Sequence, residues 1–114
     1  MATPVRVLSN REVPVTITPN PKDPKGQPTV SPGTFHVSKC RMEEVWWVCS
    51  DPNAKFTVTF EGESPFNDSV FDNENYCSGL VKREVEPSKD GESYKYSVTV
   101  NDGEPLDPDG QVDR

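Results

Sequence analysis

The chain has 114 residues, a formal net charge of -7 and only 32% hydrophobic residues, with 12 prolines and 7 glycines. This length allows one domain with one core, and the emphasis on valine, threonine and aromatic residues favours β-strands over a helical bundle. The negative charge disfavours binding to nucleic acids and to anionic membrane surfaces. We therefore expect a small acidic all-β domain without either of these partners.

The N-terminal third is expected to supply a polar start, one strand and a long connection. Residues 1–12 are mixed and polar, which predicts a frayed tail or a short edge strand. Residues 13–18 alternate well enough for a strand, but Pro14 confines that strand to a sheet edge or to a strand start. The five prolines of 19–32 exclude a helix or a central strand. We expect a solvated connection in which Thr29 and Val30 pair briefly, and a polyproline ligand is the less favoured alternative.

The stretch from 35 to 60 holds both tryptophans and predicts three consecutive strands, at 35–39, 44–49 and 55–60. A period of two places Val45, Trp47 and Cys49 on one face of the second strand, and Trp46 and Val48 on the other. Turn residues at 51–53 predict that the second and third strands form a hairpin.

The remaining segments predict further strands separated by turns. Residues 61–78 form a long polar stretch with three aromatic residues, and such a loop either packs through its aromatics or carries function. We expect a strand within 79–86, a turn at 87–91, the clearest strand at 94–100, a tight turn at 101–103 and a terminal strand within 106–112. Turns every 8–12 residues then predict a Greek-key β-sandwich of seven or eight strands that spans 13–112 as a single domain.

Three segments, at 32–39, 45–48 and 91–98, resemble strands of the cupredoxin family. The resemblance implies a cupredoxin-like sandwich, with an immunoglobulin-like sandwich as the alternative. A cupredoxin copper site needs two imidazoles and a thiolate. The positions that would supply a histidine and the cysteine hold Phe56 and Val98, and His36 is the only histidine of the chain. We therefore expect no copper and no other cofactor.

The three cysteines, Cys40, Cys49 and Cys77, leave several readings open. Together with His36 they could form a zinc site, although no Cys-x-x-Cys pair is present. A disulfide between Cys77 and one of the other two is a further possibility, and so is a thiol redox function. An odd number of thiols fits a reducing compartment, so we expect a cytoplasmic protein, or an exported one if a leader was removed.

Catalytic and calcium sites find little support. No Gly-x-Ser-x-Gly elbow is present, and we expect that the protein is not an enzyme. Residues 107–113 place oxygen-bearing side chains at alternate positions, as calcium loops do, but lack the terminal glutamate. A polar turn is the simpler interpretation.

Partner binding is the function that we expect. If Trp47 faces the core, Trp46 faces outward, where it is either an exposed anchor or covered by another segment. The aromatic residues of 61–78 should dock on the sandwich and hold their acidic neighbours outward. The candidate contact residues are Trp46, Phe66, Asp68, Phe71, Asp72, Glu74 and Tyr76. We expect a protein partner of basic charge, with a carbohydrate- or calcium-binding module as the alternative.

Overall fold

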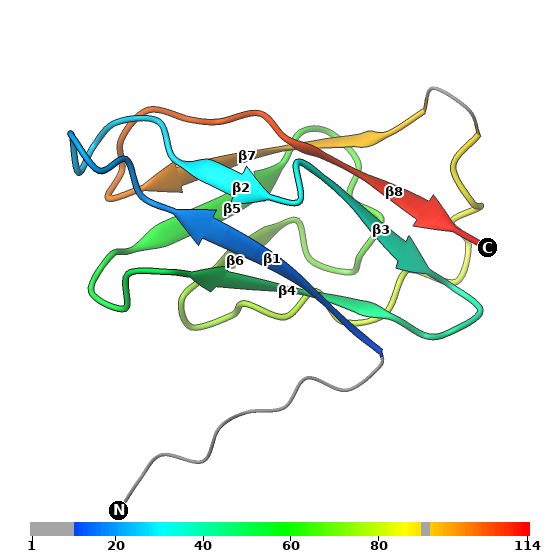
Figure 1. The fold of residues 1–114 in the computed structure, drawn as a ribbon. Coiled ribbons are helices and arrows are strands. Elements are labelled where there is room, and N and C mark those ends of the chain that lie inside the picture. Colours follow the sequence, from blue (N-terminus) through cyan, green and yellow to red (C-terminus); the bar gives the residue numbers. More distant parts are fainter. Residues whose placement is uncertain (1–10, 90–91) are drawn as a thin grey trace, which may run out of the picture.

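The computed structural model describes residues 11–89 and 92–114, and this part of the chain forms eight β-strands and no helix (Figure 1). The strands are β1 (Glu12–Thr18), β2 (Thr29–Ser31), β3 (Thr34–Ser38), β4 (Glu44–Cys49), β5 (Phe56–Phe60), β6 (Val70–Asp72), β7 (Tyr94–Val100) and β8 (Asp109–Asp113). They confirm the predicted all-β sandwich of seven or eight strands. The described residues contain no helix that could cross a membrane. The expected tail at 1–12 lies almost wholly outside them, as do two residues of the expected turn at 87–91.

Two sheets pack face to face. The smaller sheet has the order β2-β1-β4, in which β1 is antiparallel to β2 and parallel to β4. The larger sheet has the order β3-β8-β7-β5-β6, in which β3 and β8 are parallel and the other neighbours are antiparallel. The expected brief pairing of Thr29 and Val30 is confirmed, because both belong to β2 at the edge of the smaller sheet.

Of the two placements that Pro14 allowed, a sheet edge or a strand start, the second is the one observed, since β1 is the central strand of its sheet. Pro14 is tolerated there because it lies near the start of the strand. It pairs with Trp46 of β4 on one side, whereas β2 pairs only with residues from Thr16 onward. The missing N–H of Pro14 therefore removes no ladder hydrogen bond on the β2 side.

The predicted hairpin between the second and third strands is wrong. β4 belongs to the smaller sheet and β5 to the larger one, so the intervening turn carries the chain from one sheet to the other. Asp51 shapes this turn: its carboxylate accepts the N–H of Asn53 at 2.9 Å, and its carbonyl accepts the N–H of Ala54 at 3.1 Å. The apolar faces of β4 and β5 then meet across the interior instead of lying side by side in one sheet.

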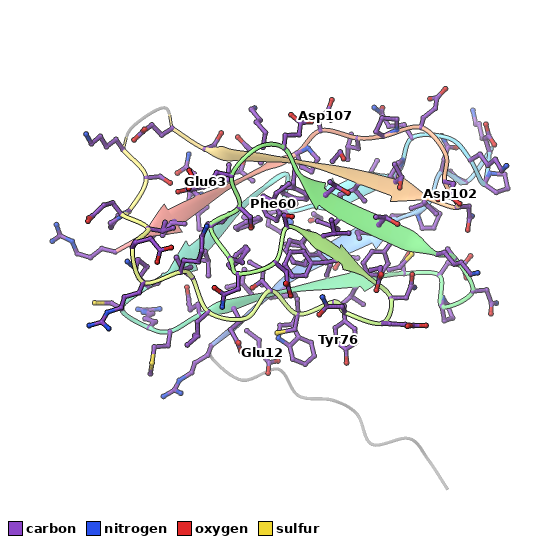
Figure 2. The ribbon with its side chains drawn as sticks, turned by 180° about the vertical axis from the view of Figure 1, so that it is seen from behind. Glu12, Phe60, Glu63, Tyr76, Asp102 and Asp107 are labelled. Atoms are coloured by element: carbon purple, nitrogen blue, oxygen red, sulfur yellow. The ribbon has the colours of Figure 1, made fainter. Side chains whose placement is uncertain are left out.

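The core follows the predicted alternation. Val45 and Trp47 of β4 are buried between the sheets, and Val48 on the opposite face is 45% exposed. Tyr96, Val98 and Val100 of β7 are also buried. Aromatic rings fill the centre of the interior, where the side chain of Phe60 lies (Figure 2). These rings fix the positions of the loops that pack against them.

The C-terminal third corrects one more prediction. Residues 79–86 form no strand and contribute one isolated bridge, between Val81 and Phe66. The ammonium group of Lys39 holds this segment instead, since it donates to the carbonyls of Arg83 and Val85. The tight turn at 101–103 and the terminal strand β8 are both confirmed, and Asn101 has the positive φ of 54° that such turns require.

Candidate functional site

The segment 61–78 docks on the sandwich through its aromatic residues, as predicted. Phe71 of β6 is 0% exposed and stacks on Trp47, with 4.8 Å between the ring centroids. Phe66 is 1% exposed and packs edge-on against the same indole at 6.4 Å. Both side chains are core residues, so a partner cannot contact them in the folded domain.

The three candidate carboxylates are exposed but do not form one patch. Asp72 ends β6 and pairs with Thr57, and Glu74 follows two residues later. Asp68 precedes β6 at its other end and does not line the surface hollow to which Asp72 and Glu74 both belong. Asp72 and Glu74 therefore belong together, and Asp68 lies apart from them.

Asp72 also shapes its own turn. Its carboxylate accepts the N–H groups of Glu74 and Asn75, each at 2.9 Å. This arrangement holds the 72–75 turn in a fixed conformation and keeps the side chain of Glu74 on the surface.

Trp46 is not the exposed platform that one reading of the sequence predicted. Its side chain is 8% exposed, and the ring of Tyr76 packs against it at 5.3 Å with an interplanar angle of 67°. Tyr76 projects from the same side of the molecule as Glu12 (Figure 2). The backbone fixes Tyr76 in this place, because its carbonyl accepts the N–H of Trp47 at 3.0 Å.

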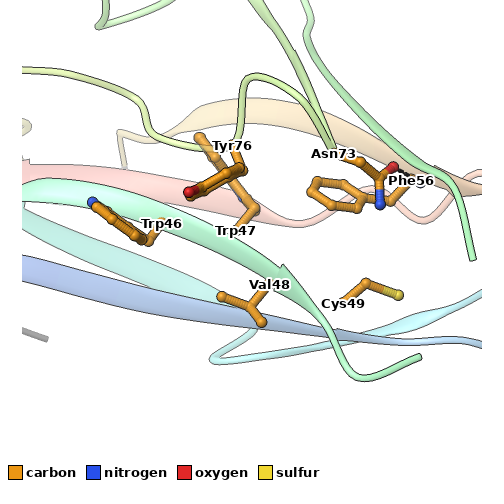
Figure 3. A pocket seen from close by; sticks show the side chains of 7 residues that line it. All are labelled: Trp46, Trp47, Val48, Cys49, Phe56, Asn73 and Tyr76. Atoms are coloured by element: carbon orange, nitrogen blue, oxygen red, sulfur yellow. Dashed lines mark hydrogen bonds between the residues drawn. The ribbon is translucent and has the colours of Figure 1, made fainter. Parts of the chain in front are cut away.

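An apolar pocket of about 450 Å³ opens at the outer edge of β4 (Figure 3). Residues from β4, from the start of β5 and from the chain after β6 line it: Trp46, Trp47, Val48, Cys49, Phe56, Asn73 and Tyr76. Tyr76 and Asn73 lie above the strand in this view, and Val48 lies below it. The segment 61–78 thus contributes one wall, and β4 contributes the other.

A second, polar hollow of about 330 Å³ adjoins this pocket and shares Phe56 and Asn73 with it. Its other lining residues are mostly charged: Lys55, Thr57, Asp72, Glu74 and Asp102. Three carboxylates face one ammonium group, so this hollow has a negative charge. Asn73 forms the boundary between the two and is held in place, since its oxygen accepts the N–H of Phe56 at 2.8 Å and its nitrogen donates to the carbonyl of Ala54 at 3.0 Å.

The cysteines do not come together. Cys40 is exposed, Cys49 and Cys77 are half-buried, and all three are free thiols. Burial raises the pKa of Cys77, and the nearby carboxylates of Glu44 and Glu12 act in the same direction. Within residues 11–89 and 92–114, no three metal-ligating side chains are grouped. The disulfide that the sequence left open is therefore not formed, and the described residues contain no Cys3His group for zinc.

The calcium-like segment 107–113 is largely strand β8, and its central carboxylate is already engaged. Asp109 accepts a hydrogen bond from the hydroxyl of Thr34 at 2.5 Å and lies 3.8 Å from the ammonium nitrogen of Lys95. The Thr34 hydrogen bond lowers the pKa of Asp109. The segment is thus mostly a strand of the larger sheet, and the interpretation as a polar turn is wrong for 109–113.

Sequence reasoning missed most of the pocket. Five of the residues that line it were not among the candidate residues: Trp47, Val48, Cys49, Phe56 and Asn73. The exposed position of Val48 opposite Trp47 was readable from the alternation of β4. The contribution of Phe56 and Asn73 was not, because it depends on the chain crossing from one sheet to the other.

Comparisons of this chain with models of known protein families, with curated proteins and with solved structures gave no match.

Proposed function

We propose that this domain is a non-enzymatic interaction module that binds a basic protein partner at the edge of β4. The apolar pocket and the polar hollow beside it are together called the edge site here. It comprises Trp46, Trp47, Val48, Cys49, Lys55, Phe56, Thr57, Asp72, Asn73, Glu74, Tyr76 and Asp102. The observation that carries the proposal is the direct contact between an apolar pocket and a negatively charged hollow. An apolar anchor surrounded by complementary charge is the usual anatomy of a protein interface.

The chemistry of the pocket favours binding over catalysis. Its only thiol is that of Cys49, and its amide, Asn73, is fully engaged with the backbone of 54–56. Among the described residues, no histidine or lysine lines the apolar pocket beside that thiol. A nucleophile without a base or an activating cation is a poor catalyst. The net charge of -7 in turn favours a basic partner over a phosphate backbone.

A small-ligand module is the second candidate, and the volume of the pocket is what favours it. A pocket of about 450 Å³ falls within the range that small molecules occupy. A sugar would require an open aromatic face, and Trp46 is 8% exposed with Tyr76 against it. A compact apolar molecule therefore fits this pocket better than the carbohydrate that we expected from the sequence.

The charge pattern provides a matched test. Asp72→Asn with Glu74→Gln removes two charges from the edge site, and the Asn side chain keeps an oxygen for the N–H groups of the 72–75 turn. Asp68→Asn removes a charge from an exposed residue outside the site and serves as the control. We expect the double variant to lose captured basic proteins in a lysate pull-down at about 50 mM salt, and the control to retain them.

The proposal fails if the double variant and the Asp68 control capture the same proteins equally well. Urea unfolding of all three proteins establishes that the fold is intact. Loss of stability in the double variant would assign these carboxylates a structural role instead.

We also propose that the sandwich is cupredoxin-like without a copper site. In support, Phe56 and Val98 are buried core residues without ligand atoms. His36 lies on β3, where its ring nitrogen is 3.3 Å from a carboxylate oxygen of Asp113 at the surface. These residues do not fit a two-histidine copper centre. Purified protein incubated with copper should develop no intense thiolate absorption band, and a stoichiometric band would contradict this proposal.

A further inference from the structure

The backbone of β4 is paired on one side and only partly covered on the other. Glu44 donates its N–H to the carbonyl of Arg11, and Ser50 donates to that of Ile17. Because N–H groups alternate along a strand, the even-numbered residues of β4 face β1 and the odd-numbered ones face the outer edge. At that edge Val45 pairs with Ser78, and the N–H of Trp47 donates to the carbonyl of Tyr76.

Cys49 is the next odd-numbered residue, and the chain that covers the edge does not reach it. The segment turns away at Asn73, whose side chain bonds to the backbone of 54–56 in the other half of the sandwich. Cys49 is opposite Ile17 in the ladder with β1, but by the alternation of β4 its own N–H and carbonyl face away from β1, and no hydrogen bond outside the strand ladders of the described residues involves them. Both groups therefore point toward an open edge, and Cys49 itself lines the apolar pocket there.

We infer that the edge site binds its partner as an extended peptide segment, which continues the smaller sheet beside Cys49. This inference rests on the proposed interaction function and specifies the form of the partner. The segment places one apolar side chain in the pocket and exchanges backbone hydrogen bonds with Cys49. A lysine or arginine next to that anchor then lies beside Asp72 and Glu74 in the polar hollow.

Three features favour this occupant over a second copy of the chain or a flat protein surface. An open strand edge is a template for one extended backbone. The pocket adjoins that edge, so one residue of the segment can fill it while its neighbours stay in register. The charge of the hollow selects a cation, whereas two copies of a chain with a net charge of -7 repel each other.

The test uses a random library of linear seven-residue peptides, displayed on phage and selected on immobilised protein. Wild-type protein is compared with a Cys49→Trp variant, in which the larger side chain fills the pocket beside the open edge. We expect the wild type to enrich peptides with an apolar residue next to lysine or arginine. The same peptides should not be retained by Cys49→Trp, whose fold is checked by circular dichroism and urea unfolding.

A selected peptide, made synthetically, then tests the backbone and the charges separately. Methylating the amide nitrogen of the anchor or of either neighbour, one at a time, removes one backbone donor per peptide. The most affected of these peptides should bind about five- to tenfold more weakly. Asp72→Asn with Glu74→Gln should weaken binding about three- to tenfold at low salt, and Asp68→Asn should leave it unchanged. If Cys49→Trp does not fold, alkylation of Cys49 in a Cys40→Ser background replaces it as the means of blocking the pocket.

Several outcomes would overturn the inference. It fails if no peptide is enriched, if the enriched peptides are acidic, if a blocked pocket binds them equally well, or if every methylated peptide keeps its affinity. The proposed interaction function can survive each of these results. Lysate capture that still depends on Asp72 and Glu74 would then indicate a folded basic surface as the partner instead of an extended segment.

Discussion

Trp47 is the centre of the aromatic core, and replacing it tests the packing of the two sheets most directly. Its indole stacks on Phe71 at 4.8 Å, and four further rings surround it at 6.0 to 6.4 Å. Trp46, next to it in sequence, lies on the outer face of the sheet with the ring of Tyr76 5.3 Å away. The two tryptophans thus form a matched pair with the same chemistry and different surroundings.

The expected loss of stability follows from these surroundings. Truncating a buried tryptophan to alanine costs about 3 to 5 kcal/mol, which is a large part of the 5 to 15 kcal/mol that holds a typical domain together. The milder change to phenylalanine keeps one ring and leaves the protein folded. We expect Trp47→Phe to cost about 2 kcal/mol, because four of the five surrounding rings belong to strands and cannot close the cavity. Trp46→Phe should cost about 1 kcal/mol or less, since its neighbours on the outer face can relax.

Urea unfolding followed by circular dichroism measures both changes, and equal slopes of the two transitions confirm that stability alone has changed. Each variant retains one tryptophan, so its fluorescence reports on one indole at a time. Equal losses for the two variants, or a greater loss for Trp46→Phe, would refute the assignment of Trp47 to the centre of the core.

Further predictions address the backbone and the titrating groups. Gly110→Ala should lower the free energy of unfolding by about 1 to 3 kcal/mol, because the added methyl group would overlap a buried phenylalanine ring. Gly33→Ala is the control in the same urea assay: its methyl group would contact no other atom, and its stability should stay within about 0.5 kcal/mol of wild type. Burial raises the pKa of Tyr96 to about 12, so its contribution to stability is constant below pH 10, and about 2 to 3 kcal/mol should be lost as the pH rises from 10 to 12. In a variant with Tyr76→Phe and Tyr94→Phe, where Tyr96 is the remaining tyrosine, tyrosinate absorbance that appears at pH 10 without loss of structure would contradict this. Burial also raises the pKa of the Cys77 thiol, so at neutral pH Cys77 should react with a thiol reagent more slowly than the exposed Cys40. Equal reaction rates in variants that keep only one of these cysteines would contradict the burial of Cys77.

For the candidate site, the local sequence pattern predicted that the acidic residues are exposed but not which of them line the same hollow. Aromatic residues five positions apart in 61–78 indicated a loop that docks on the sandwich, and Phe66 and Phe71 do so. Whether Asp68 belongs with Asp72 depends on β6, a strand of three residues too short to recognise from alternation. Asp72 pairs with Thr57 of β5, whereas Asp68 precedes the strand.

For the fold, the alternation of β4, β5 and β7 could be read from sequence, because a period of two reflects a backbone that places successive side chains on opposite faces. Strand pairing could not be read in this way. A turn such as 51–54 serves equally well within one sheet or between two, and only the packing of Trp47 against rings from the other sheet selects the crossover. That crossover brings Phe56 and Asn73 to the edge of β4. The strands were therefore determined locally, whereas the pocket exists only because distant segments of the chain meet there.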